Sequence, residues 1–254
     1  MFILLISLLA VSAPADTVSK ETFIRCGDYN LPDSTCRKLE NIIESTPHTK
    51  GHSHRLSELP EQVMTTHFLK ENQSVLEIGS NTGRNTLTIA KILGGSGTFY
   101  TSESNKSDRL KTIKNLKANQ LSHSNVHVIP AISNSPLEQR GWYTRPRTLF
   151  GWLKRWEPVE SEPLPAVKFD TIIADCEGCF LKMTDDYPEL LENATTIIIE
   201  NDWKSMRDYD KIHQRFRHYG FKTAYNHHGP KYLKKRFSEE QYSHFYEVLI
   251  KEQH

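Results

Sequence analysis

The chain has 254 residues, of which 25% are charged, and acidic and basic residues nearly cancel to a net charge of +1. This length is typical of one domain with a complete hydrophobic core, and the balanced charge gives no indication of a nucleic-acid-binding protein. The negative mean hydropathy of -0.57 excludes a protein with several membrane spans.

The N-terminal segment has the pattern of a secretory signal. An apolar run from Phe2 to Val11 is too short to span a bilayer comfortably, and Ala13 and Ala15 give an A-x-A cleavage pattern. No lysine or arginine precedes the run, so a buried helix or a retained membrane anchor stays open as an alternative. We therefore predict a signal peptide or short anchor at residues 1–15. This places the protein in the secretory pathway or outside the cell, with a membrane-anchored or cytoplasmic location as the alternative.

Four cysteines fall into two pairs. Cys26 and Cys36 lie in a polar lead-in at residues 16–56 and can close a small loop in an oxidising compartment. Cys176 and Cys179 form a C-x-x-C beside a predicted strand end, but no second pair follows at zinc-ribbon spacing. We interpret this second pair as two ordinary buried or half-buried thiols, with a redox pair as the alternative.

The first candidate site is a strand, a glycine turn and a helix. Residues 74–78 predict a buried strand, and Gly79-Ser80-Asn81-Thr82-Gly83 predicts a turn whose small residues let a ligand approach the backbone. Helical spacing then continues to Gly94. The G-x-x-x-G spacing differs from dinucleotide and phosphate-binding motifs, and the acid Glu77 argues against a phosphate ligand. An amphipathic helix at residues 57–70 precedes this unit and is expected to form one wall of the pocket.

The next strand, at residues 97–103, ends in Glu103. A carboxylate at that position faces the ligand crevice of a parallel sheet and can accept hydrogen bonds from a ribose diol. Each such bond is worth about 1.5–3 kcal/mol. After a surface helix at 107–121, a third strand at 125–133 brings Ala131 and Ile132 to the same crevice, where they are expected to lie against an adenine ring.

Residues 137–167 interrupt the alternation of strands and helices. Aromatic and basic side chains are interleaved there, namely Trp142, Tyr143, Phe150, Trp152, Trp156, Arg140, Arg145, Arg147, Lys154 and Arg155. Aromatic faces with cations suit a sugar, an anion, a lipid headgroup or single-stranded nucleic acid. We predict an insertion or lid, and the simpler alternative is a short amphipathic helix folded onto the domain.

Further acids follow the fourth and fifth strands. The strand at residues 169–175 ends in Asp175, and Glu177 follows in its turn. These two carboxylates can take a proton from a substrate hydroxyl or bind a divalent cation. The fifth strand, residues 194–200, ends in Glu200. We predict no dedicated metal site.

The element order predicts the fold class. After a helix at 179–191 that is interrupted at Pro188 and a helix at 210–219, two final strands at 221–225 and 245–250 lack a crossover helix between them. The sequence therefore predicts an α/β fold with a doubly wound, mostly parallel seven-stranded sheet. Helices cover both faces, and an antiparallel pair forms the C-terminal edge.

Residues 74–250 resemble FkbM-type methyltransferases that use S-adenosylmethionine (SAM) and mostly methylate hydroxyl oxygens. The matching segments are Glu77-Ile78-Gly79-x-Asn81-x-Gly83, Glu103, Ala131-Ile132-Ser133-Asn134, Asp175-x-Glu177-Gly178 and Ile198-Ile199-Glu200. Where the family often has an acid after the D-x-E-G glycine, this chain has Cys179 and Phe180. The resemblance covers most of an expected methyltransferase domain at residues 57–254.

The resemblance implies roles for these residues. SAM would be bound by Glu77, Gly79, Ser80, Asn81, Gly83, Glu103, Ala131 and Ile132. Asp175 would be the base, with Glu177 or Glu200 orienting a hydroxyl on a small molecule, sugar or lipid-linked glycan. Nucleic acid is not expected as a partner. The alternative is a secreted, non-catalytic protein of this fold that holds a glycan or acidic partner through residues 137–167.

Overall fold

The computed structural model describes residues 24–47, 58–141, 143–148, 155–203 and 205–252. The predicted signal or anchor at residues 1–15 lies outside this part of the chain. The same is true of Trp142, Phe150, Trp152 and Lys154 in the aromatic-basic segment. No helix among the described residues is both long and apolar enough to cross a membrane.

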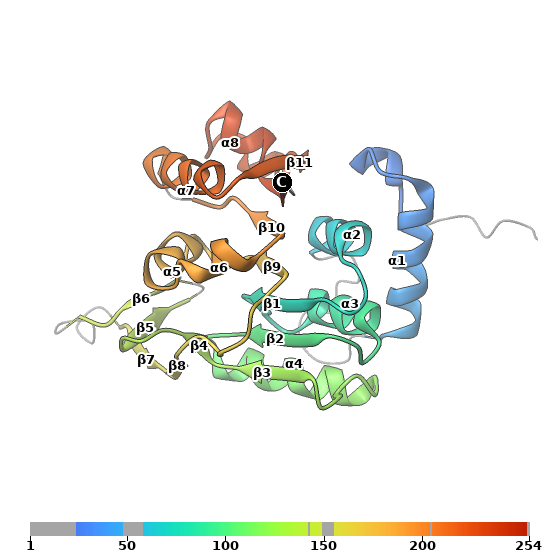
Figure 1. Cartoon of the computed structure of the whole chain (residues 1–254), viewed down its shortest axis with the longest axis horizontal. Helices are drawn as coiled ribbons and strands as arrows, with labels where there is room; N and C mark the ends of the chain where they lie inside the picture. The colour runs from blue at the N-terminus through green and yellow to red at the C-terminus, as the bar shows by residue number, and fades with distance from the viewer. Residues whose placement is uncertain (1–23, 48–57, 142, 149–154, 204, 253–254) are drawn as a thin grey trace, which may run out of the picture.

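Seven strands form the main sheet in the order β11-β12-β10-β9-β1-β2-β3 (Figure 1). Their bounds are β1 Ser74–Ile78, β2 Thr98–Ser102, β3 Val126–Ile129, β9 Thr171–Ala174, β10 Thr196–Glu200, β11 Phe221–His227 and β12 Tyr246–Lys251. The pairs from β3 through β10 are parallel, whereas β12 runs antiparallel to both β10 and β11. The predicted fold class is thus confirmed. The last strand in the sequence, β12, lies between β10 and the edge strand β11.

The sheet reverses its winding direction between β1 and β9. The chain proceeds outward from β1 to β2 and β3, and then crosses to β9 on the other side of β1. In open α/β sheets, ligands bind at the carboxyl ends of the strands where the order reverses. The residues that follow β1, β2, β9 and β10 are therefore the place to look for a site.

Alternate residues of the strands face two separate helical layers. Val75 of β1 belongs to a core with α2 (Leu59–Phe68), α3 (Arg84–Leu93) and α4 (Lys106–Ala118). Its neighbour Leu76 belongs to a second core with α5 (Phe180–Asp186), α6 (Glu189–Asn193) and α7 (Met206–His218). Figure 1 shows α5 to α7 on one side of the strands and α2 and α3 on the other. This accounts for the continuous apolar character of the central strands.

Prolines divide two elements that the hydrophobic pattern presents as continuous. Pro188 separates α5 from α6, as predicted, because proline cannot continue the backbone hydrogen bonding of a helix. Pro130 separates β3 from β4 (Ala131–Ile132), which leaves the main sheet and pairs with β8 (Ser161–Glu162). Ala131 and Ile132 thereby lie just beyond the carboxyl end of β3.

The aromatic-basic segment contains strands in the part that the structure describes. β5 (Leu137–Arg140) pairs antiparallel with β6 (Tyr143–Pro146) and with β7 (Glu157–Val159). For these residues the alternative of a short amphipathic helix is wrong. The guanidinium of Arg145 lies 3.9 Å from the centroid of the Trp156 ring, so a cation–π contact joins β6 to the residue before β7.

The N-terminal lead-in packs on α2. A disulfide joins Cys26 in the 3-10 helix η1 (Cys26–Tyr29) to Cys36 in α1 (Asp33–Ser45), as the sequence suggested. Both cysteines belong to a small apolar cluster that includes Val63 of α2. The disulfide therefore joins η1 to α1, and the apolar cluster packs both elements against α2.

Replacing Cys26 and Cys36 together by alanine should lower the free energy of unfolding by roughly 2–3 kcal/mol, because the reduced unfolded chain gains loop entropy. Urea denaturation of the oxidised full chain measures this difference. A double alanine variant of Cys176 and Cys179 should lose less, because that bridge spans a sequence separation of 3 rather than 10. Equal midpoints for wild type and the Cys26/Cys36 variant would contradict the expectation.

Candidate functional site

The turn after β1 lies directly against the strand ends on both sides. The backbone N–H groups of Gly79 and Ser80 donate to the carbonyl oxygen of Ser102, at 2.9 and 3.2 Å. On the other side, a Cβ added to Gly79 would lie 1.7 Å from the backbone oxygen of Asp175, and the φ of Gly79 is +91°. Glycine is therefore required here for both conformation and space.

The side chain of Glu103 is hydrogen-bonded to this turn. One carboxylate oxygen accepts from the backbone N–H of Asn81 at 2.8 Å, and the other accepts from the N–H of Asn105 at 2.7 Å. Burial raises the pKa of Glu103, and these two backbone hydrogen bonds oppose the shift. The predicted proximity of Glu103 to the turn at residues 79–83 is confirmed. Asn105 also caps α4, because its side chain accepts hydrogen bonds from the backbone N–H groups of Ser107 and Asp108.

A cavity of about 670 Å³ opens between the turn, the end of β3 and the end of β9. This volume lies within the range of about 300–1,000 Å³ that is typical of small-molecule sites. Seven of the predicted site residues line it, namely Gly79, Asn81, Glu103, Ala131, Ile132, Asp175 and Glu177. Strands far apart in the sequence thus bring most of the predicted site together.

Glu77 lies behind the turn and does not line the larger cavity. One of its carboxylate oxygens accepts hydrogen bonds from the hydroxyls of Thr86 and Thr101, both at 2.6 Å. Burial raises its pKa to about 7, and the two threonine hydrogen bonds act against that shift. Glu77 therefore ties β1, β2 and α3 together, and its expected effect on a cofactor is indirect. Gly83 caps α3 and does not line that cavity either.

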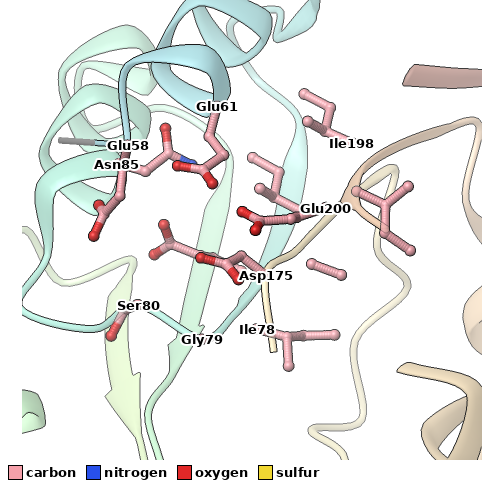
Figure 2. A pocket seen from close by; sticks show the side chains of 13 residues that line it. Glu58, Glu61, Ile78, Gly79, Ser80, Asn85, Asp175, Ile198 and Glu200 are labelled. Atoms are coloured by element: carbon pink, nitrogen blue, oxygen red, sulfur yellow. The ribbon is translucent and has the colours of Figure 1, made fainter. Parts of the chain in front are cut away.

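Several acids meet around a second, much smaller cavity of about 10 Å³ (Figure 2). Glu61 of α2, Asp175 after β9 and Glu200 at the end of β10 each offer an oxygen, and these three oxygens lie within 4.8 Å of one another. Glu58 and Glu77 also line this cavity. Asp175 lines both cavities and therefore connects the acid cluster with the larger one.

Burial and mutual repulsion raise the pKa values of these acids. The pKa of Glu61 is raised to about 8, first by burial and then by the charge of Asp175. Burial likewise raises the pKa of Asp175 and Glu200 well above their usual ranges, with further contributions from neighbouring carboxylates. Each of these groups therefore takes up protons more readily than a solvated acid does.

Sequence reasoning did not identify three acids in this region, namely Glu58, Glu61 and Asp202. Glu58 and Glu61 lie within residues 57–70, the helix that was expected to form a wall of the pocket. The signal that could have identified Glu61 is its helical spacing with Met64 and Phe68, which places it on the apolar face. The third is Asp202, whose two carboxylate oxygens are buried without hydrogen-bond partners among the described residues. Burial and the charge of Glu177 raise the pKa of Asp202.

Cys176 and Cys179 form a disulfide, with a Cα–Cα distance of 5.4 Å. The interpretation of this pair as two ordinary thiols is therefore wrong. The bridge closes the turn that contains Glu177 and Gly178, whose φ angles are +55° and +80°. Both cysteines line the larger cavity, so the disulfide forms part of its wall next to Asp175.

No protein-family model matches the chain, and no curated protein sequence matches it significantly. Solved structures with a related arrangement include a SAM-dependent methyltransferase from Aquifex aeolicus, at 16% identity, a TM-score of 0.42, and coverage of 83% of this chain and 96% of that one. A candidate tRNA (m1A22) methyltransferase from Streptococcus pneumoniae has 15% identity, a TM-score of 0.43 and coverage of 80% and 72%. A candidate rRNA methylase from Clostridium thermocellum has 11% identity, a TM-score of 0.45 and coverage of 81% and 98%.

Proposed function

We propose that this protein is a SAM-dependent methyltransferase that acts on a hydroxyl oxygen. The observation that carries the proposal is the larger cavity, which has the glycine turn and Glu103 on one side and Asp175 with Glu177 on the other. A ligand-binding end and an acidic end thus share one cavity at the place where the sheet reverses its winding.

The residues at the turn suit SAM. The side-chain oxygen Oδ1 of Asn81 is buried without a hydrogen-bond partner among the described residues, so it is available to the ammonium group of the methionine part. Each carboxylate oxygen of Glu103 accepts one backbone N–H and keeps capacity for a ribose hydroxyl. Ala131 and Ile132 offer apolar surface to the adenine. Bound SAM would supply an activated methyl group.

The protein's part in the reaction is to position the acceptor and remove its proton. Asp175 is the proposed base, because it lines the larger cavity and its raised pKa makes it a better proton acceptor than a solvated aspartate. Glu177, in the next turn, would orient the acceptor hydroxyl. Glu200 lines only the smaller cavity and would act on Asp175 rather than on the acceptor.

A thermal-shift scan of the full chain with SAM and with S-adenosylhomocysteine tests the assignment. Both nucleosides should raise the melting temperature, because each binds only the folded state. Stabilisation by neither would favour the alternative, a non-catalytic protein that binds a glycan or acidic partner through β5 to β7.

The acceptor is proposed to be a small molecule, a sugar or a lipid-linked glycan in the secretory pathway. Two disulfides support an oxidising compartment. RNA is a further acceptor class to test, since two of the similar structures are named as candidate RNA methylases. Methyl transfer from labelled SAM to separate glycan, lipid and RNA fractions distinguishes these classes.

Replacing Glu103 by alanine should raise the dissociation constant for SAM roughly tenfold or more, because one or two charge-assisted hydrogen bonds are lost. Isothermal titration calorimetry measures the change. Glu192 is an exposed glutamate at the end of α6, and its alanine variant should bind SAM like wild type. An unchanged constant in the Glu103 variant would remove Glu103 from the cofactor site.

A further inference from the structure

The acid cluster at the smaller cavity concentrates more negative charge than a folded interior tolerates without compensation. Carboxyl groups of Glu58, Glu61, Glu77, Asp175 and Glu200 line a cavity of about 10 Å³. Buried carboxylates require protons, basic partners or a metal ion.

Basic partners account for only part of this charge. Arg84 acts on Glu58 and opposes the rise of its pKa. Among the described residues, no ion pair joins Glu61, Asp175 or Glu200 to a lysine, arginine or histidine. These three are also the residues whose oxygens converge within 4.8 Å.

A fourth oxygen at this cavity lacks a partner. Asn85 is 7% exposed, and its Oδ1 atom has no hydrogen-bond donor in the part of the chain that the structure describes. Asn85 lines the same cavity, and Figure 2 shows its amide group beside the carboxyl of Glu61, with the nitrogen toward that carboxyl. Rotation of the amide group would exchange the two atoms and turn Oδ1 toward a cation among the acids. A buried amide oxygen without a donor is an unusual cost in a folded protein, and a cation would remove it.

The dimensions suit a single ion. Oxygens on opposite sides of a Ca²⁺ ion lie about 4.6–5.2 Å apart, and those around Mg²⁺ lie about 4.0–4.2 Å apart. The three oxygens of the cluster lie within 4.8 Å of one another, which accommodates either ion. A cavity of about 10 Å³ has room for about one water-sized particle. An all-oxygen ligand set favours hard cations over zinc or copper.

We propose that the smaller cavity binds one hard divalent cation, held by Glu61, Asp175, Glu200 and Asn85. The sequence-based prediction included no dedicated metal site, and this proposal departs from it. Asp175, the proposed base, lines both cavities, whereas Glu61, Glu200 and Asn85 do not line the larger one. Variants of Glu61 and Asn85 therefore test cation binding apart from the proposed methyl transfer. The ligands come from α2, α3 and the ends of β9 and β10, so a bound ion would also hold the helical wall to the sheet.

Mn²⁺ is a suitable probe, since its paramagnetic resonance signal is lost on binding and it accepts the same oxygen ligands as Mg²⁺ and Ca²⁺. Titration of the chelator-treated full chain should show one tight equivalent of Mn²⁺ that excess Mg²⁺ or Ca²⁺ displaces. Glu61→Gln keeps the side-chain size and should raise the Mn²⁺ dissociation constant at least tenfold. Asn85→Ala should raise it by about threefold or more, and Glu192→Gln on the surface should leave it unchanged.

Two results would overturn the proposal. One is the absence of Mn²⁺ binding at millimolar concentration, which would mean that the acids share protons instead. The other is the same affinity in wild type and in both cavity variants, which would place the ion elsewhere. Asn85→Ala provides an independent test if Glu61→Gln does not fold. SAM binding, measured on the same samples by calorimetry, reports on the proposed methyltransferase function separately.

Discussion

Replacing Asp175 by asparagine is expected to lower methyl transfer by about 100-fold or more, because general-base catalysis typically contributes a factor of that size. The amide keeps the shape of the side chain but cannot accept the acceptor's proton. SAM binding should change little, since the turn and Glu103 are untouched. Transfer of tritiated methyl groups from SAM into a cell extract, together with calorimetry for SAM, measures both quantities.

A matched control uses the same substitution on an exposed aspartate. Asp210 lies on α7 and does not line either cavity. Its asparagine variant should transfer methyl groups at the wild-type rate. Undiminished transfer by the Asp175 variant would reject Asp175 as the base. Glu177, which also lines the larger cavity, would then be the next candidate.

Replacing Gly79 by alanine is expected to abolish SAM binding and to destabilise the fold. The new methyl carbon would overlap the backbone oxygen of Asp175 at 1.7 Å, and a side chain at a φ of +91° adds strain of about 1–2 kcal/mol. Relief of the overlap must move the turn away from β9 and so change the larger cavity. Differential scanning fluorimetry with and without SAM measures the loss of stability and of the ligand-induced shift.

Two further glycines separate these effects. A Cβ on Gly97 would lie 2.1 Å from the backbone oxygen of Gln73. Gly97 directly precedes β2, at the opposite end of that strand from the cavity. Gly97→Ala should therefore melt at a lower temperature yet still respond to SAM. Gly27 has no atom within 4 Å of an added Cβ, so Gly27→Ala should behave as wild type. A normal SAM response from Gly79→Ala would show that the turn does not form the cofactor site.

The fold was predictable because its signals are local. The apolar strand before Gly79 and the acid at the end of the next strand, Glu103, each stand in a short window of sequence. The parallel order of the strands then brings them together without further information. The same reasoning placed Asp175 at the correct edge of the sheet.

The missing parts depend on contacts between distant segments. Glu61 reads as an ordinary helix position, and only the packing of α2 over β10 brings it to Glu200. The spacing of Cys176 and Cys179 fits both free thiols and a bridge, so sequence alone cannot choose between them. The three-stranded sheet of β5 to β7 is short and rich in charge, and it lacks the alternation that marks a strand.

The disulfide beside Asp175 also bears on how the protein should be prepared. Dithiothreitol, added routinely to recombinant enzymes, would reduce this bond. The bond closes the turn that contains Glu177 and directly follows Asp175. Expression in the reducing cytosol of a bacterium would have the same result before purification began. An assay that fails under those conditions would therefore describe the reduced polypeptide, and oxidative folding belongs in the protocol from the first trial.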